Sequence, residues 1–409
     1  MNKRILITGI GVIAPNGIGK EEYWKALKAG KSGIKAPTVI DVTYFKSKLA
    51  AECTDFKAED FLGAKGLRNL DRSSKLVCSA VKLALDDSGL EITEENTDDI
   101  GVVTATTLSI TSDIAKFSKE IADEGFKFTN PALFPPTTMN FPSSQIAIRN
   151  KIKGFNTTIA SGYTAGLDAL KYAATFINNG RAKAVLVAGV ESLGFSVFVG
   201  FSKVGFLAGA TGPEISCPFD KRHNGIILGE GTAVLLIEEE EYALKRKAKI
   251  YAEVLGVDTN FDAYRMSKYD PQARGLKRCM QRVIDYSSIS QEDITYISAA
   301  ANSVGEQDWL ETMAIKDVFG MYAEAVPVSS IKSMIGESIS ANGVLQLAAA
   351  VGSVQENFIP PTINFEEPAK GCDLDYVPNK ARKQEVKNVL INNFGPGGNN
   401  ASAIVSKYK

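Results

Sequence analysis

The chain has 409 residues, of which 44% are hydrophobic, and its formal net charge is −1. This length allows a large hydrophobic core and two structural halves, and the near-neutral charge offers no electrostatic footprint for a nucleic acid or an anionic membrane. No run of 18 or more apolar residues occurs, so we expect no membrane span.

The N-terminus and the cysteines favour a cytoplasmic protein. The first four residues lead directly into an apolar run and lack the features of a signal peptide. Five cysteines are widely spaced without a C-x-x-C pair, which is typical of reduced thiols in structural roles. The single histidine, His223, excludes a multi-histidine metal site, and we expect it to be structural or exposed.

The first third of the chain alternates predicted strands and helices. Residues 5–13 form an apolar run with glycines, which predicts a buried strand. This run lacks the third glycine and the following helix of a dinucleotide-binding loop. Residues 67–85 predict one long amphipathic helix, and residues 100–104 predict the next buried strand.

Residues 156–180 combine a short β-rich run, a glycine turn and a helix that Gly180 ends. This arrangement is typical of a nucleophile elbow, which projects one side chain and offers backbone N–H groups to an anion. Tyr163 occupies the projecting position. A phenol ionises at about pH 10 and a thiol at about 8.5, so Tyr163 is a poor substitute for cysteine in acyl transfer.

The elbow resembles that of the β-ketoacyl-acyl carrier protein synthases. In that family the motif T-A-C-x-x-G holds the cysteine that carries the acyl chain, and here the window reads Ser161-Gly162-Tyr163-Thr164-Ala165-Gly166. The continuation to Leu170 is more similar to one subfamily, the chain length factors of type II polyketide synthases. Those homologues lack the cysteine and pair with a competent ketosynthase.

Other blocks carry the resemblance from residue 5 to residue 405. Residues 217–231 resemble P-F-D-x-x-R-x-G-x-x-x-G-E-G, with His223 at the arginine position. Residues 392–401 resemble N-x-F-G-F-G-G-x-N-A, and Pro396 replaces the phenylalanine that gates the acyl channel in the family. Because proline fixes φ and has no swinging side chain, the resemblance implies that this gating is lost.

The second half lacks both histidines of the family. Residues 296–320 align without gaps to the block with the first histidine, where Ala300 stands, and Glu337 replaces the second. In the enzymes these histidines polarise the thioester and stabilise an enolate. Ala300 offers no donor, and ionised Glu337 would repel an anion. Lys332 is retained, and we expect it to form a buried ion pair with Glu337 that holds the shape of the site; catalytic use of the pair is the alternative.

The resemblance also implies where an acyl chain would lie. It places residues 105–121 beside the dimer interface and the end of the acyl pocket. Thr111, Ile114 and Ser118 recur at helical spacing and share one face. With Phe134 and Pro396, they are expected to line the substrate pocket and to limit chain length. An ordinary surface helix is the alternative.

The resemblance implies an α/β fold of the thiolase-like class, with a duplicated α/β/α/β/α arrangement in five layers. A weak internal echo fits this duplication, because a strand–turn–helix pattern at 157–179 recurs at 326–355. Residues 238–247 have acids before bases, which predicts a solvated helix that bridges the halves. The expected halves are residues 1–246 and 247–409.

The implied function is that of a non-catalytic chain length factor. It would heterodimerise with a cysteine-bearing ketosynthase, serve an acyl carrier protein and shape the pocket for a polyketide or polyene chain, with no cofactor and no metal. One alternative is a stand-alone malonyl-carrier decarboxylase or an acyltransferase with another nucleophile. Another is a self-associating scaffold or ligand-binding protein. The residues at positions 163, 300 and 337 disfavour the stand-alone enzyme.

Overall fold

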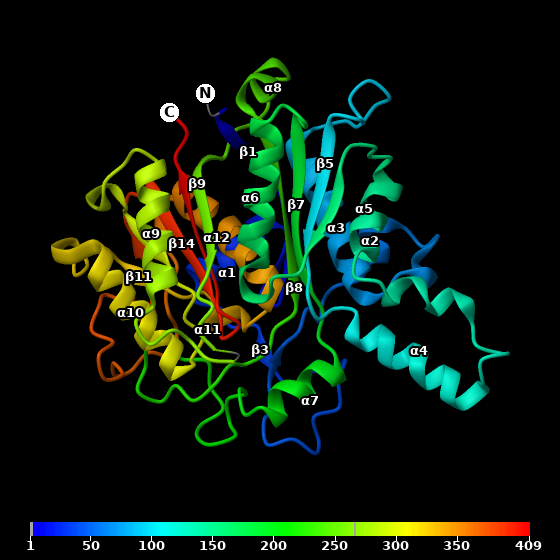
Figure 1. Cartoon of the computed structure of the whole chain (residues 1–409), viewed down its shortest axis with the longest axis horizontal. Coiled ribbons are helices and arrows are strands. Elements are labelled where there is room, and N and C mark those ends of the chain that lie inside the picture. Colours follow the sequence, from blue (N-terminus) through cyan, green and yellow to red (C-terminus); the bar gives the residue numbers. More distant parts are fainter. Residues whose placement is uncertain (1–2, 266) are drawn as a thin grey trace.

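A computed structural model describes residues 3–265 and 267–409 (Figure 1). Its strands are β1 (Ile5–Ala14), β2 (Gly17–Ile18), β3 (Ile34–Lys35), β4 (Ala50–Ala51), β5 (Ile100–Ala105), β6 (Asn156–Ile159), β7 (Ala184–Glu191), β8 (Gly231–Glu239), β9 (Ala252–Phe261), β10 (Tyr296–Ser298), β11 (Val328–Ser329), β12 (Phe358–Ile359), β13 (Arg382–Lys383), β14 (Asn388–Phe394) and β15 (Asn399–Ser406).

The α-helices are α1 (Lys20–Lys28), α2 (Glu59–Leu62), α3 (Arg72–Ser88), α4 (Thr111–Glu124), α5 (Phe141–Asn150), α6 (Ala165–Asn178), α7 (Phe195–Lys203), α8 (Glu240–Lys245), α9 (Arg274–Tyr286), α10 (Gly305–Phe319), α11 (Lys332–Ile335) and α12 (Asn342–Glu356). Short 3-10 helices are η1 (Leu67–Asn69), η2 (Pro131–Leu133), η3 (Pro135–Thr137), η4 (Gly162–Thr164), η5 (Gln291–Asp293), η6 (Gly320–Tyr322) and η7 (Ile339–Ala341).

One 11-stranded sheet organises the chain, with strand order β11-β10-β14-β15-β9-β1-β8-β7-β5-β6 and with β2 paired to β1. The two sets of strands join where residues 5–7 of β1 pair antiparallel with β9. The strands β7 and β8 are buried along their whole length. Continuous apolar runs of this kind are typical of strands that are covered on both faces.

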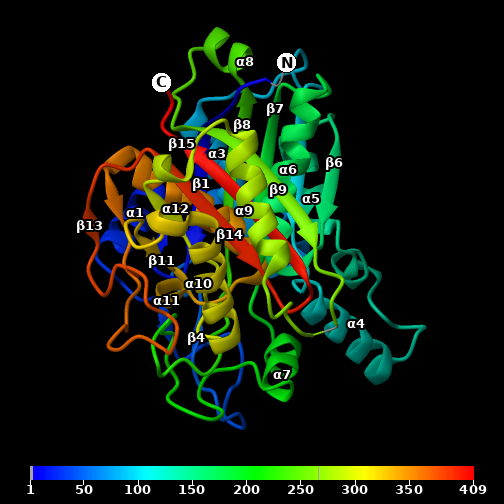
Figure 2. The same ribbon diagram turned by 60° about the vertical axis from the view of Figure 1, so that its left-hand side comes forward.

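Five layers result from the way the helices cover these strands (Figures 1 and 2). The helices α6 and α12 form the middle layer, because each contacts strands of both sets. On the outer faces, α3 packs on β1, β7 and β8, and α9 packs on β9 and β15. The α/β, thiolase-like architecture expected from the sequence is therefore confirmed.

The middle layer is closely packed because small residues face each other there. A Cβ atom on Gly166 would lie 2.9 Å from the backbone nitrogen of Val344 and 3.0 Å from the Cα atom of Gly343. Any larger side chain at either glycine would push the N-termini of α6 and α12 apart. Because α6 follows the elbow, this contact helps to fix the position of the elbow in the core.

The internal echo predicted from the sequence corresponds to two similar units. The first runs from β6 through η4 to α6, and the second from β11 through α11 and η7 to α12. The strands β6 and β11 lie at opposite ends of the sheet, and each pairs in parallel with its neighbour. The short helices η4 and η7 contact each other, so the two units meet at the elbow.

Two predicted helices differ from the structure. The helix expected over 67–85 is broken at Leu70, because Asp71 caps a new helix by accepting a hydrogen bond from the backbone N–H of Ser74. The helix expected over 238–247 is only α8, because Glu238 and Glu239 still belong to β8. Glu238 is buried and is held there by the Arg246 guanidinium, a contact that the charge pattern alone did not indicate.

Two further observations concern the cysteines and the helices. All five cysteines are free and buried. Within the described residues, no helix combines the length and apolarity that crossing a bilayer demands.

Candidate functional site

Tyr163 projects from η4, between the end of β6 and the start of α6. The turn before it is held by hydrogen bonds to other segments. The backbone N–H of Gly162 donates to Thr107 Oγ1 (3.2 Å), and Asn399 Nδ2 donates to the carbonyl oxygen of Ser161 (2.8 Å). Within the elbow, the hydroxyls of Ser161 and Thr164 donate to Asp168 Oδ2. The strand–turn–helix geometry expected for a nucleophile elbow is therefore present.

The Tyr163 ring fills the space beside this turn. A Cβ atom on Gly395 would lie only 2.6 Å from Cδ2 of the ring, so the aromatic side chain lies directly against that glycine. The ring also packs against the buried apolar cluster that includes Phe198, Leu228 and Ile339. Burial, followed by the negative charge of Glu337, raises the pKa of Tyr163 well above the ordinary phenol value. The phenol is therefore protonated at neutral pH and is not an activated nucleophile.

Glu337 is the most tightly held side chain at the site. Its Oε2 accepts hydrogen bonds from Lys332 Nζ (3.0 Å) and Asn302 Nδ2 (2.8 Å). Its Oε1 accepts hydrogen bonds from the backbone N–H of Ile339 (2.9 Å) and from Asn342 Nδ2. The expected ion pair with Lys332 is present, and both side chains are almost fully buried. With four donors on one carboxylate, Glu337 has a structural environment rather than that of a free base.

Ala300 lies in the same buried frame, where only its backbone is polar. Its carbonyl oxygen accepts from Lys332 Nζ (2.8 Å) and Gln307 Nε2 (3.0 Å). Its N–H donates to Glu311 Oε1 (2.9 Å), and the N–H of Ala301 donates to Glu311 Oε2 (2.8 Å). Lys332 therefore bridges the two positions at which the family has histidines.

Glu311 is a buried acid that sequence reasoning did not single out, although it matched the family block. Burial raises its pKa to about 7, and this rise is opposed by the N–H of Ala300, the amide of Asn392 and the charge of Lys332. Sequence patterns cannot identify such a group, because its environment comes from segments far apart in the chain.

A second buried acid, Asp308, holds the loop between β10 and α10, which contains Ala300. Its Oδ1 accepts from the backbone N–H of Asn302 (3.1 Å), and its Oδ2 accepts from that of Phe219 (2.8 Å). His223 Nδ1 lies 2.9 Å from Oδ2. The lone histidine thus pairs with the acid that holds this loop, and its hydrogen-bond partner is Asp308 and not a residue of the elbow turn.

Pro396 lies in the turn that joins β14 to β15. The backbone N–H of Gly398 donates to the carbonyl oxygen of Gly395 (3.0 Å), which closes the turn around Pro396. This hairpin tip lies over η4. Tyr163, Ala300, Lys332, Glu337 and Pro396, all selected from the sequence, are therefore brought to one region of the molecule.

Comparisons with known proteins identify the family. The family models described as "Beta-ketoacyl synthase, N-terminal domain" and "Beta-ketoacyl synthase, C-terminal domain" match residues 2–243 and 251–366. The chain belongs to the β-ketoacyl synthase family. A 3-oxoacyl-[acyl-carrier-protein] synthase 2 from Coxiella burnetii is 37% identical to this family member over 99% of both chains.

Two solved structures of the β-ketoacyl synthase family align with the whole chain. "The ishigamide ketosynthase/chain length factor" has a TM-score of 0.94 and 31% sequence identity, and the alignment covers 100% of each chain. A type II polyketide synthase acyl-carrier protein in complex with its ketosynthase, AntDE:AntF, provides a chain with a TM-score of 0.92 and 26% identity, again with 100% coverage of each. The proteins that this chain resembles thus include a 3-oxoacyl-[acyl-carrier-protein] synthase 2 and a ketosynthase/chain length factor.

In this family member, α4 and Phe134 lie apart from the residues around the elbow. None of the residues of α4 is buried, and Ile114 and Ser118 are exposed. Thr111 donates its hydroxyl hydrogen to the carbonyl oxygen of Leu108 (2.7 Å), near the start of the helix. The ring of Phe134 is half-exposed and lies 5.8 Å from that of Phe117 on α4. The role of these residues in chain length remains a prediction.

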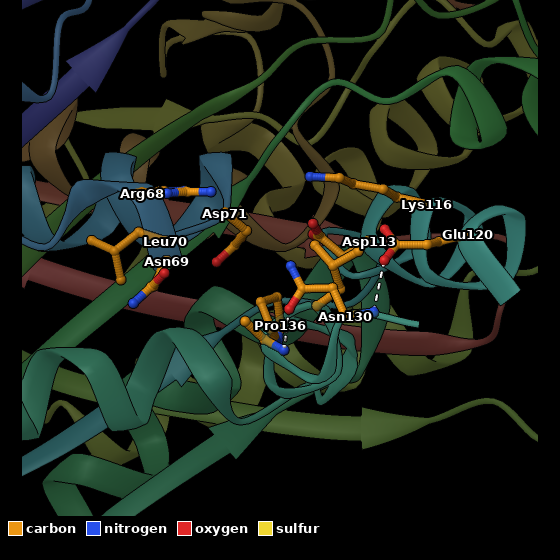
Figure 3. A pocket seen from close by; sticks show the side chains of 11 residues that line it. Arg68, Asn69, Leu70, Asp71, Asp113, Lys116, Glu120, Asn130 and Pro136 are labelled. Atoms are coloured by element: carbon orange, nitrogen blue, oxygen red, sulfur yellow. Dashed lines mark hydrogen bonds between the residues drawn. The ribbon is translucent and has the colours of Figure 1, made fainter. Parts of the chain in front are cut away.

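A polar cavity of about 530 Å³ lies between α4 and residues 68–71 (Figure 3). On the α4 side it is lined by Asp113, Lys116 and Glu120. These residues occur two positions after Thr111, Ile114 and Ser118, which corresponds to roughly 200° around a helix. The face that we expected to set chain length therefore points away from this cavity and toward the outside of the single chain.

The described part of the chain offers no ligand set for a metal ion. No group of three or more His, Cys, Asp or Glu side chains in residues 3–265 and 267–409 is arranged to hold one.

Proposed function

We propose that this chain is a chain length factor, the non-catalytic partner of a cysteine-bearing ketosynthase. The single observation that carries the proposal is the condition of the three positions where the family has its reactive groups. Tyr163 is a protonated phenol packed on Gly395, Ala300 has no side-chain donor, and Glu337 is held by four hydrogen-bond donors.

Decarboxylation and condensation both create an anion, which requires donors or positive charge aimed at it. The Lys332 ammonium already donates hydrogen bonds to the carbonyl oxygen of Ala300 and to Glu337. If Lys332 left Glu337 to bind a substrate anion, the buried charge of Glu337 would lose its partner. The arrangement therefore favours a structural role for the former active site.

The surface around α4 supports the existence of a partner subunit. The exposed residues Ile114, Ile121, Phe126 (89% exposed), Phe128 (74% exposed) and Phe134 are all apolar and lie on or after α4. Figures 1 and 2 both show α4 projecting from the body of the molecule. An apolar surface of this kind is typical of a protein interface. The strand β6 ends the sheet and pairs only with β5 among the described strands, so its outer edge is open to another strand.

We infer that the partner is a ketosynthase that holds the growing chain and receives its units from an acyl carrier protein. The likeness to a ketosynthase/chain length factor and to a ketosynthase solved with its acyl carrier protein supports both partners. The exposed face of α4, with Thr111, Ile114 and Ser118, would then close the far end of the acyl pocket in the complex.

The test of this function uses the purified chain alone and with a cysteine-bearing ketosynthase. Each sample receives acyl-carrier and malonyl-carrier substrates, and intact mass reports covalent acyl adducts while product formation is followed in parallel. We expect no adduct and no product from the chain alone, and product from the pair. A stable adduct on Tyr163 or on any cysteine of this chain, together with product, would refute the proposal.

A further inference from the structure

The carboxylate of Glu191, the last residue of β7, holds the loop that leads into α4. Glu191 is only 3% exposed. Its Oε1 accepts a hydrogen bond from the backbone N–H of Thr107 (2.7 Å), and its Oε2 accepts one from the hydroxyl of Ser109 (2.9 Å). The backbone N–H of Leu108 donates to both oxygens at 3.2 Å. One buried carboxylate thus binds three successive residues just before the helix begins.

The segment that follows Glu191 also contacts the first turn of α4. A Cβ atom on Gly194 would lie 2.1 Å from Ser112 Oγ, so the glycine leaves room for that hydroxyl. The backbone N–H of Leu193, in the same segment, donates to Oε2 of the buried Glu230 (3.1 Å). This segment is therefore tied to the core on one side and holds the start of α4 on the other.

The remainder of α4 is less firmly attached. None of its residues is buried, and it contacts α7, η2 and η3. Of these short helices, η2 has no buried residue and η3 has one, Pro136. Figures 1 and 2 show α4 projecting from the body of the molecule. The direction of the helix therefore depends mainly on how its first residues are fixed.

A small change at that end would be amplified along the helix. Since an α-helix rises about 1.5 Å per residue, a tilt of about 10° at Ser109 would move Ser118 by roughly 2 Å. The face with Thr111, Ile114 and Ser118 is the proposed wall for the growing chain. A shift of this size is comparable to the length that one two-carbon unit adds to an extended chain.

We infer that Glu191 is a positioning residue for chain length. It fixes the start of α4 and thereby the place of the face that stops the chain, while its own hydrogen bonds go to residues 107–109. This inference rests on the proposed function. It adds that product length depends on a buried acid of β7 as well as on the side chains of the wall.

Two substitutions weaken this anchor from its two sides. Glu191→Gln keeps the size of the side chain, but its NH₂ group is a donor and would face the N–H of Leu108, which donates to both oxygens of the natural residue. Ser109→Ala removes one donor from the loop and leaves Glu191 in place. Ser109→Ala is the milder change and carries the test if Glu191→Gln does not fold.

The control is Glu52→Gln, because the surroundings of Glu52 match those of Glu191. Glu52 is also buried and accepts hydrogen bonds from two successive backbone N–H groups and one hydroxyl, but these belong to Thr38 and Val39. The substitution therefore costs a similar set of hydrogen bonds in a loop that does not lead into α4.

The experiment has two measurements. Amide hydrogen exchange of the chain alone reports the anchor, and we expect Glu191→Gln and Ser109→Ala to speed exchange in residues 107–124 at least about tenfold, with α6 unchanged. Mass spectrometry reports the lengths of the products made with a cysteine-bearing ketosynthase. We expect both variants to broaden the distribution and to shift its mean by at least one two-carbon unit, and Glu52→Gln to leave both measurements unchanged.

Lengths are compared as fractions of the product formed, so a loss of turnover alone does not count as a shift. A merely structural role for Glu191 would lower the yield of complex or product at unchanged lengths, and this result would overturn the inference. Unchanged exchange in residues 107–124, or an equal shift of lengths by Glu52→Gln, would also overturn it. Failure of the proposed function is a different result, because the unmodified chain would then give no product with the ketosynthase.

Discussion

We propose that the residue at position 163 keeps this chain from carrying an acyl group and that the residue at position 337 keeps a carried group from reacting. Tyr163→Cys supplies the thiol but leaves Ala300 without a side-chain donor and Glu337 saturated by its four partners. Groups that act as a unit in catalysis lose nearly the whole rate when one is missing. We therefore expect no condensation product from this variant.

The measurement is product formation from acyl-carrier and malonyl-carrier substrates, with a cysteine-bearing ketosynthase as the positive control. A thermal unfolding curve for the variant confirms that it is folded. Robust condensation by Tyr163→Cys alone would show that the positions 300 and 337 are not needed.

Glu311 predicts a pH dependence of stability. Its pKa is raised from 4.5 to about 7 in the folded chain, so the folded chain retains a proton that the unfolded chain releases. The stabilisation is complete below pH 4.5 and is lost as the pH rises through about 7. The loss should amount to on the order of 3 kcal/mol in the free energy of unfolding.

Glu311→Gln cannot ionise and is the matched control. Urea unfolding at a series of pH values should show that the natural chain loses stability relative to Glu311→Gln as the pH rises from 4.5 through about 7. Parallel curves for the two proteins would mean that Glu311 ionises in the folded chain as it does in the unfolded one.

At the scale of a single element, α4 is the segment whose exposed face has no role within one chain. We predict that this face limits the length of the product made by the partner. Packed walls tolerate few added methylene groups, so side-chain volume at Thr111, Ile114 and Ser118 would decide where a growing chain stops. Ile114→Ala should lengthen the product, and Thr111→Phe or Ser118→Phe should shorten it, with little change in total turnover.

Mass spectrometry of the products from each variant with its partner checks this prediction. Lys119→Ala is a suitable control, because Lys119 is exposed on the same helix and pairs with Asp123. An unchanged product distribution across all three variants, with the complex intact, would remove the length-setting role from α4.

At the scale of the whole molecule, the uncovered apolar surface predicts a stable complex. Obligate interfaces bury on the order of 2,000 Å² or more, and such a surface left uncovered tends to aggregate. Co-expression with a cysteine-bearing ketosynthase should give a heterodimer by light scattering. Ile121→Asp combined with Phe128→Asp should weaken that complex at least about tenfold, since both substitutions would bury unpaired charges at an apolar interface.

Leu244→Asp provides the control. Leu244 is also exposed and apolar, but it lies on α8, far from α4 in both views (Figures 1 and 2). A soluble monomer that ignores the ketosynthase would contradict the prediction. So would a complex that tolerates the two changes on and after α4 as well as it tolerates Leu244→Asp.

The sequence by itself determined the fold class, the elbow and the identity of the residues at the reactive positions. The buried strands and the elbow helix follow from local apolar patterns, which depend on neighbours in the chain. The residue types at positions 163, 300 and 337 can also be read directly, because a missing thiol or imidazole needs no structure to be noticed. The break of the helix at Leu70 was missed, although Asp71 is a good N-cap residue.

Only the tertiary structure decided what surrounds those residues. The hydrogen bond from Asn302 to Glu337 and the contact of Gly395 with Tyr163 join segments that are distant in the sequence. The raised pKa of Glu311 comes from burial, which also depends on distant segments. The same is true of α4, whose apolar residues would suit a buried helix but none of whose residues is buried in the single chain. Burial, charge pairing and exposure depend on where the whole chain places each group, and local patterns do not contain that information.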